Sequence, residues 1–274
     1  MLEISQYRHP REKLYFLACA FVGIWFLPFT FSMALFLAPS LWFAQQFFKA
    51  SLYGNAGLVS ERQYPELHKM VMDGCRSLGI QNPPAVFVLQ GDGALNALAV
   101  RFLGGRYVLL YANLVDLMVE KGMAREMKMI ICHELAHHAA GHTNPWKHLL
   151  IAPARMMPYL GMAYSRACEF TADRLGAACV GDLLAAKRAL VTIAVGSRVL
   201  KTDMAVFVAQ EQQIPGIFGL LSEVYASHPR ITRRILELDT IAALMPKKKT
   251  GQIAASRQVP QAETRMRDDI PIEG

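Results

Sequence analysis

An apolar stretch without a single charged side chain, from residue 14 to residue 48, constrains the fold of this 274-residue chain more than any other feature. A continuous helix of that length would measure roughly 50 Å, whereas the hydrocarbon core of a bilayer is about 30 Å thick. The stretch also exceeds the apolar core of a signal peptide, which runs to about 15 residues. The sequence therefore predicts an N-terminal membrane segment over residues 14–48.

Two arrangements of this segment are open, one long tilted helix with an interfacial end or a tight hairpin that turns near Pro28 to Ser32. Basic residues flank the stretch on both sides, and the positive-inside rule places both flanks in the cytoplasm, which favours the hairpin. The five cysteines are odd in number and irregularly spaced, as in a reducing compartment. We expect a cytoplasmic N-terminus over residues 1–13.

The remainder of the chain predicts one α+β domain over residues 49–245, rich in helices and carrying a small sheet. Apolar periodicity and breaker residues indicate helices near 63–78, 124–140, 163–180, 183–200 and 228–244, strands at 85–89 and 107–111, and a candidate edge strand within 94–102. The polar segment 246–274 is typical of a disordered tail. The formal net charge of +7 is scattered along the chain, so we expect no nucleic-acid partner.

An HExxH motif lies within the predicted helix 124–140 and consists of His133, Glu134 and His137. The two histidines are one helical turn apart, so both imidazoles can bind one zinc ion, and Glu134 is placed beside the metal as a general base. The surrounding residues of this helix are apolar, and burying three such polar side chains without a partner would be costly. The motif therefore indicates a zinc site.

A third ligand is needed to complete such a site. The metzincin spacing would require glycine at 140 and histidine at 143, but the chain has Ala140 and Thr143. His142 is on the same helix but off the expected spacing. Such a histidine is more often structural or a support behind the ligands, so it is left out of the ligand set. A better candidate is Glu169, on the predicted helix 163–180.

Asp173 lies one turn after Glu169 on the same helix face. It could accept a hydrogen bond from a ligand imidazole and fix its tautomer. The alternative is a solvated charged face that also includes Arg166 and Arg174. The sequence alone leaves these two interpretations equally open.

Three motifs together carry a resemblance to a known family: HELAHH at 133–138, EFTAD at 169–173 and SHPRITRRI at 227–235. In this order and spacing they resemble the membrane-associated gluzincin peptidases that include bacterial HtpX and the CAAX prenyl proteases. The resemblance covers residues 60–240 and implies a zincin-like fold and a zinc-dependent endopeptidase that uses a metal-activated water. It implies zinc binding by His133, His137 and Glu169, with Glu134 as the base and Asp173 as the supporting acid.

The same resemblance assigns roles to residues outside the two helices. His228 would lie close to the zinc and steady the oxyanion, and Arg234 would organise the site. Asn96 and Ala97 match an element near the edge strand where such enzymes bind an extended peptide by strand addition. Protein or peptide substrates and the lipid bilayer are the expected partners.

One departure from the HtpX pattern is the interval 143–164, where relatives carry further membrane spans. Here it contains basic residues and prolines and cannot form a spanning pair. It is either a membrane-surface or substrate-gating segment or part of the core. The flanking charges and the cysteines predict a cytoplasmic catalytic domain, and the resemblance implies a bacterial inner membrane. We expect a protease that acts in membrane protein quality control or on one dedicated precursor. CAAX activity is not expected, because those enzymes resemble multi-span chambers.

Overall fold

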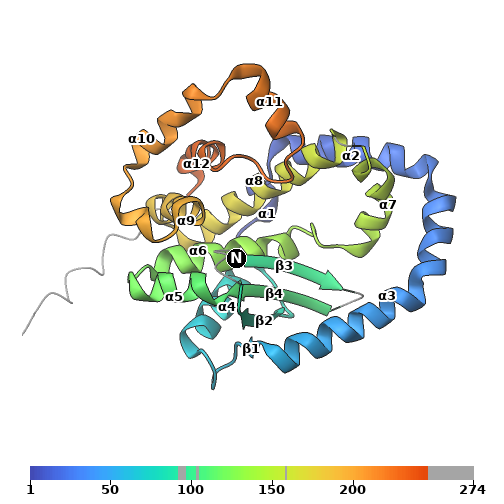
Figure 1. Cartoon of the computed structure of the whole chain (residues 1–274), viewed down its shortest axis with the longest axis horizontal. Helices are drawn as coiled ribbons and strands as arrows, with labels where there is room; N and C mark the ends of the chain where they lie inside the picture. The colour runs from blue at the N-terminus through green and yellow to red at the C-terminus, as the bar shows by residue number, and fades with distance from the viewer. Residues whose placement is uncertain (92–96, 103–104, 158, 246–274) are drawn as a thin grey trace, which may run out of the picture.

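The computed structural model describes residues 1–91, 97–102, 105–157 and 159–245, and within them helices surround one small sheet (Figure 1). The helices are α1 (Ile4–Tyr7), α2 (Pro10–Trp25), α3 (Leu27–Asn55), α4 (Pro65–Leu78), α5 (Ala112–Glu120), α6 (Ala124–Ala139), α7 (Pro145–Arg155), α8 (Leu160–Val180), α9 (Leu183–Val195), α10 (Met204–Ala209), α11 (Gly216–Val224) and α12 (Ile231–Asp239). The strands are β1 (Gly57–Leu58), β2 (Ala85–Leu89), β3 (Ala97–Phe102) and β4 (Gly105–Tyr111). The helix-rich α+β class expected from the sequence is what the structure has.

The sheet has the order β1-β2-β4-β3, with β2 and β4 parallel and the two outer strands antiparallel to their neighbours. Side chains alternate across it because successive strand residues point to opposite faces. Val108 and Leu110 join the main core, whereas Phe87 and Leu109 pack with Leu52 at the end of α3. The edge strand expected within residues 94–102 is confirmed as β3. Residues 94–96 of the expected range lie outside the described part of the chain.

The two helices that carry the polar motifs, α6 and α8, pack closely against each other in the core. Gly176 permits this approach, since a Cβ there would lie 2.7 Å from the Met129 sulfur and 3.2 Å from the backbone nitrogen of His133. A larger residue at 176 would push the helices apart. Gly176 therefore sets the distance between the motif of α6 and that of α8.

The apolar N-terminal segment differs from both arrangements expected from the sequence. The chain bends at Phe26, and α3 runs without a break through residues 28–32, where the hairpin turn was expected. Thr30 and Ser32 donate their hydroxyls to carbonyls of the preceding turn, so they are compatible with a helix. The segment is two helices, α2 and α3 (Figure 1), and they make few contacts with each other.

The first of these helices, α2, packs against α7 and α8. A Cβ at Gly23 would lie only 1.7 Å from the Leu150 carbonyl oxygen, so only glycine lets α2 and α7 come this close. Cys19 is fully buried between them. Residues 14–25 therefore pack as part of the folded domain, although the sequence analysis placed them in the anchor.

The second helix, α3, has 29 residues, about 44 Å at 1.5 Å per residue. Its apolar window has a mean hydropathy of 1.5 and none of it is buried inside the structure. By length and composition α3 could cross a membrane. Figure 1 shows it curving along one side of the molecule before its end reaches the sheet.

The first residues of the chain are fixed to distant parts of the domain. The backbone N–H of Leu2 donates to the Ser77 carbonyl at 2.7 Å, and the Tyr7 hydroxyl donates to the Leu244 carbonyl at 2.9 Å. Arg8 donates to the carbonyl of Ala140, at the end of α6, at 2.7 Å. The segment expected to be a separate cytoplasmic N-terminus is thus packed on the domain.

The interval 143–164 combines features of both interpretations offered above. Ile151 and Ala154 of α7 are buried against α2 and α8, which is core packing. Trp146 and Met156 have exposed fractions of 72% and 86%. One side of this segment is therefore packed and the other side carries exposed apolar surface. The expected tail, residues 246–274, lies outside the described residues.

Candidate metal centre

Helix α6 presents the two motif histidines on one face. The Nε2 atoms of His133 and His137 lie 3.3 Å apart, because residues four positions apart on a helix are stacked one turn above the other. The helix is buried over most of its length, so the imidazoles are held by core packing rather than by a loop. One ring nitrogen of each histidine therefore lies beside the other in the interior.

Helix α8 brings Glu169 to the same point. Its Oε2 lies 3.6 Å from Nε2 of His133, and its Oε1 lies 3.5 Å from Nε2 of His137. One ligand atom from each of these three residues lies within 4.8 Å of the other two. Two imidazoles and one carboxylate around an open position are the donor set of catalytic zinc sites, so these side chains fit that ion.

A second layer of charge lies behind the ligands. Asp173 Oδ1 is 2.9 Å from Nδ1 of His133, and both Asp173 oxygens accept hydrogen bonds of 2.7 Å from Arg234. Burial would raise the pKa of Asp173, but Arg234 and His133 hold it below its ordinary value. Asp173 therefore stays an anion in the interior and orients the His133 ring.

The pKa values of the two histidines are shifted in opposite directions. Burial alone would lower the pKa of His133, but Asp173 and Glu169 outweigh it and raise that pKa to about 10. Burial keeps the pKa of His137 well below its ordinary value. A site that holds a proton this firmly next to two carboxylates is electrostatically suited to a cation.

Glu134 lies beside this centre without belonging to the ligand set. Burial raises the pKa of its carboxyl to about 7, and the backbone N–H of Ala99 on β3 and the nearby His133 and Arg234 partly oppose that effect. A carboxylate with a pKa near neutrality can both accept and return a proton, as a general base requires.

A cavity of about 1010 Å³ opens over the centre. Residues 97–100 of β3 form one wall, so Ala97 lies where the sequence analysis placed it, while Asn96 is outside the described residues. β3 is the last strand of the sheet, and no other strand of the described chain pairs with its outer edge.

His228 and Arg234 also lie close to the Glu169 carboxylate. His228 Nε2 lies 3.6 Å from Glu169 Oε1, and its Nδ1 is 2.9 Å from the Ser227 hydroxyl. The His228 side chain is 63% exposed, so it stands at the mouth of the cavity. Arg234 is buried and also approaches Glu169 Oε2 at 3.6 Å.

Two further residues near the centre are absent from the ligand set that the sequence predicts. His142, left out of the ligand set, lies with its Nδ1 3.0 Å from Nδ1 of His137. Glu12, at the start of α2, lies next to His142. A charged residue just before an apolar stretch is typical of a membrane flank, so the sequence offered no signal for Glu12.

Comparison with protein families adds an independent finding. The model of peptidase family M48 matches residues 61–150 and 144–242, about two thirds of the chain. No curated protein and no solved structure matches it. The matched region contains every described residue of the candidate centre except Glu12.

Proposed function

Because this chain belongs to peptidase family M48 and is therefore a metallopeptidase, we propose that it is a zinc-dependent endopeptidase anchored in a membrane by α3. The observation that carries the proposal is the convergence of His133, His137 and Glu169 beside Glu134 under a cavity walled by an edge strand. The substrate is a protein or peptide chain.

His133, His137 and Glu169 would hold the zinc ion. When bound there, zinc supplies a Lewis acid for the scissile carbonyl and lowers the pKa of water towards about 7. The protein residues supply the rest. The Asp173 carboxylate contacts Nδ1 of His133 and so keeps that ring oriented, and Arg234 keeps Asp173 in place.

Glu134 moves the proton. Its carboxylate accepts the proton of the attacking water and then gives it to the nitrogen of the leaving amine, which a pKa of about 7 permits in both directions. His228, exposed at the cavity mouth and 3.6 Å from Glu169, donates through Nε2 to the oxygen of the scissile carbonyl as negative charge develops there. Backbone groups of β3 would pair with the substrate main chain.

The decisive experiment is Glu134→Gln in the purified full-length protein. We expect zinc binding to persist while peptide cleavage is lost. Cleavage by a variant with full zinc content would contradict the mechanism. A wild type that binds zinc but cleaves no peptide would instead indicate a non-catalytic scaffold that retains the fold.

For the biological role we propose quality control of membrane proteins at the cytoplasmic face of a bacterial inner membrane. Support comes from the apolar α3 and from strand pairing, which uses main-chain groups and selects little by sequence. Glu134→Gln can serve as a substrate trap in cells. Capture of many unrelated membrane proteins would support this role, and capture of a single precursor would indicate a dedicated processing protease.

A further inference from the structure

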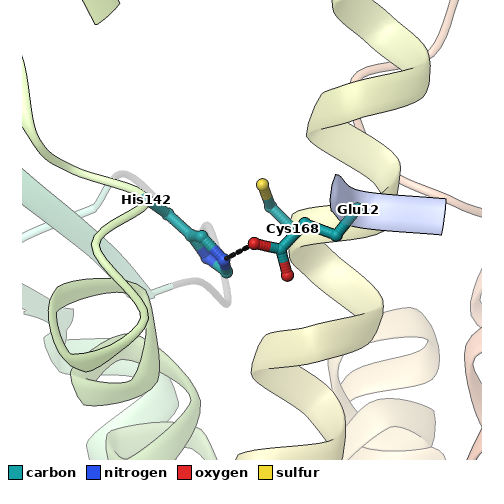
Figure 2. Close-up of side chains that lie close together, drawn as sticks. All are labelled: Glu12, His142 and Cys168. Carbon is teal, nitrogen blue, oxygen red and sulfur yellow. Dashed lines mark ion pairs between the residues drawn. The ribbon is translucent and has the colours of Figure 1, made fainter. Parts of the chain in front are cut away.

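A second buried cluster lies directly behind the metal centre, formed by Glu12, His142 and Cys168 (Figure 2). His142 follows α6 after a turn at Gly141, whose φ of 75° favours glycine. Glu12 belongs to the first turn of α2, and Cys168 precedes Glu169 on α8. Helix α2, which leads into the apolar α3, therefore contributes a side chain next to the centre.

The contacts form one continuous line from the metal ligand to α2. His137 Nδ1 is 3.0 Å from His142 Nδ1, and His142 Nε2 is 3.3 Å from Glu12 Oε1, the pair joined by the dashed line in Figure 2. The other nitrogen of His137, Nε2, faces Glu169. Each imidazole thus uses one nitrogen towards the centre and the other away from it.

One arrangement of hydrogens gives each ring nitrogen in this line a role that agrees with its neighbour. A neutral imidazole carries a single N–H, and the nitrogen that binds a metal has none. With Nε2 of His137 towards the metal, its Nδ1 carries the hydrogen and donates to Nδ1 of His142. The hydrogen of His142 is then on Nε2, which faces the carboxylate of Glu12.

The carboxylate at the end of the line is firmly held. Arg8 donates to Oε1 of Glu12, and the Thr171 hydroxyl donates to Oε2 at 2.5 Å. Thr171 lies on α8 between Glu169 and Asp173, so the same helix supports both the centre and Glu12. Glu12 is 4% exposed and is the only anion of the described chain within ion-pair distance of His142.

We propose that Glu12 and His142 are positioning residues of the metal site: Glu12 fixes His142, and His142 fixes the tautomer and orientation of His137. The inference rests on the proposed metal-dependent function. Under this proposal helix α2, which precedes the apolar helix α3, contributes a residue that supports the metal site. Residues that orient metal-bound histidines typically contribute 10 to 100 fold to metal affinity or activity.

The alternative occupant of this cluster is a second metal ion, and the surroundings disfavour it. The guanidinium of Arg8 contacts Glu12 and would repel a cation there. Burial raises the pKa of the Cys168 thiol far above its ordinary value, whereas metal ligation needs the thiolate. The three side chains are therefore better suited to contacts with one another through their hydrogens than to binding a second metal ion.

The test uses the full-length protein in detergent micelles and measures zinc affinity by chelator competition, which does not depend on peptide cleavage. We expect Glu12→Gln and His142→Gln each to bind zinc 10 to 100 fold more weakly and to lower kcat with little change in KM. The visible spectrum of the cobalt-substituted variants should shift, because the orientation of the His137 ring changes. Glu12→Asp should recover part of the affinity.

The matched control is Cys168→Ser, from the same cluster but outside the line of contacts, and it should bind zinc as the wild type does. The double variant of Glu12 and His142 should lose no more affinity than the worse single variant, since both act through His137. Three outcomes would overturn the inference. The first is a loss of zinc affinity in the double variant that equals the sum of the two single losses, and the second is unchanged affinity in both single variants. The third is a wild type with two zinc ions per chain, one of which is lost in Cys168→Ser. A wild type that binds one zinc ion without cleaving peptides would refute the proposed function and leave the inference testable.

Discussion

Arg234 donates to both carboxylate oxygens of Asp173, at 2.7 Å each, and neither side chain is more than 6% exposed. The pair joins α12 to α8 directly behind His133, a proposed metal ligand. Arg234→Leu should cost about 3–5 kcal/mol of folding free energy, because it leaves the buried Asp173 charge unpaired. Chemical denaturation of the metal-free protein measures this.

A double variant, Arg234→Leu with Asp173→Leu, provides the control for that prediction. Replacing both partners by apolar side chains removes the unpaired charge, so its unfolding free energy should be closer to the wild type than that of Arg234→Leu alone. Equal losses in the single and the double variant would argue against the ion pair as the cause.

Removal of a ligand should differ from removal of a supporting group. Glu169→Ala should yield protein without bound zinc, because a three-residue site loses one of its donors. Asp173→Asn should weaken zinc binding by about 10 to 100 fold without abolishing it. Metal analysis after dialysis distinguishes the two, and full zinc content in Glu169→Ala would refute the ligand assignment.

The edge strand gives a third prediction. Ala99→Pro removes the N–H that donates to Glu134, and proline is tolerated at a sheet edge. We expect a folded protein with raised KM and lowered kcat, since both the strand pairing and the environment of the base are altered. Ala99→Ser keeps the N–H and should retain activity. Circular dichroism checks that both variants fold, and steady-state kinetics compare their kcat and KM. Equal kinetics for Ala99→Pro and Ala99→Ser would exclude this role for the N–H.

The pH dependence of stability offers a fourth prediction, at Glu12. Burial would raise its pKa, but His142, Thr171 and Arg8 lower it below the ordinary value of 4.5. A carboxyl with a lowered pKa in the folded state stabilises the protein above pH 4.5, and this stabilisation is lost as the pH falls. The difference in unfolding free energy between wild type and Glu12→Gln should therefore be largest near pH 7 and shrink towards pH 3. A difference in unfolding free energy that does not change with pH would contradict a lowered pKa of Glu12.

Topology gives a fifth prediction. Cys75 is 1% exposed and burial raises its pKa to about 11, so its thiol is a poor reporter. A cysteine introduced at the exposed Gln63 is better placed. For a cytoplasmic domain, a membrane-impermeant maleimide should label Gln63→Cys only after cell lysis. Labelling of intact cells would place the domain on the other side.

The sequence predicted those parts of the fold that depend on local pattern. The helices of both motifs, strands β2 and β4 and the edge strand β3 follow from periodicity and breaker residues. Ends were less predictable: the helix expected to reach residue 200 stops at Val195, where Gly196 adopts a positive φ, and a 3₁₀ helix follows. Such endings depend on which glycine adopts a positive φ.

Long-range contacts were beyond the sequence. Composition alone could not divide residues 14–48 between a packed helix and an exposed one, because both are apolar. The division depends on the fit of Gly23 against Leu150. Glu12 was missed for a similar reason, since its partners Thr171 and His142 are more than a hundred residues away.

The hydrogen bond from Tyr7 to the Leu244 carbonyl has a consequence for the order of assembly. It joins residues 237 positions apart, so the N-terminal segment cannot dock fully until the ribosome has delivered nearly the entire described chain. Closing so long a loop is entropically costly and slow compared with local helix formation. Glu12 would then reach His142 late in folding, and a nascent chain would have an incompletely positioned metal site while its neighbours are still being made.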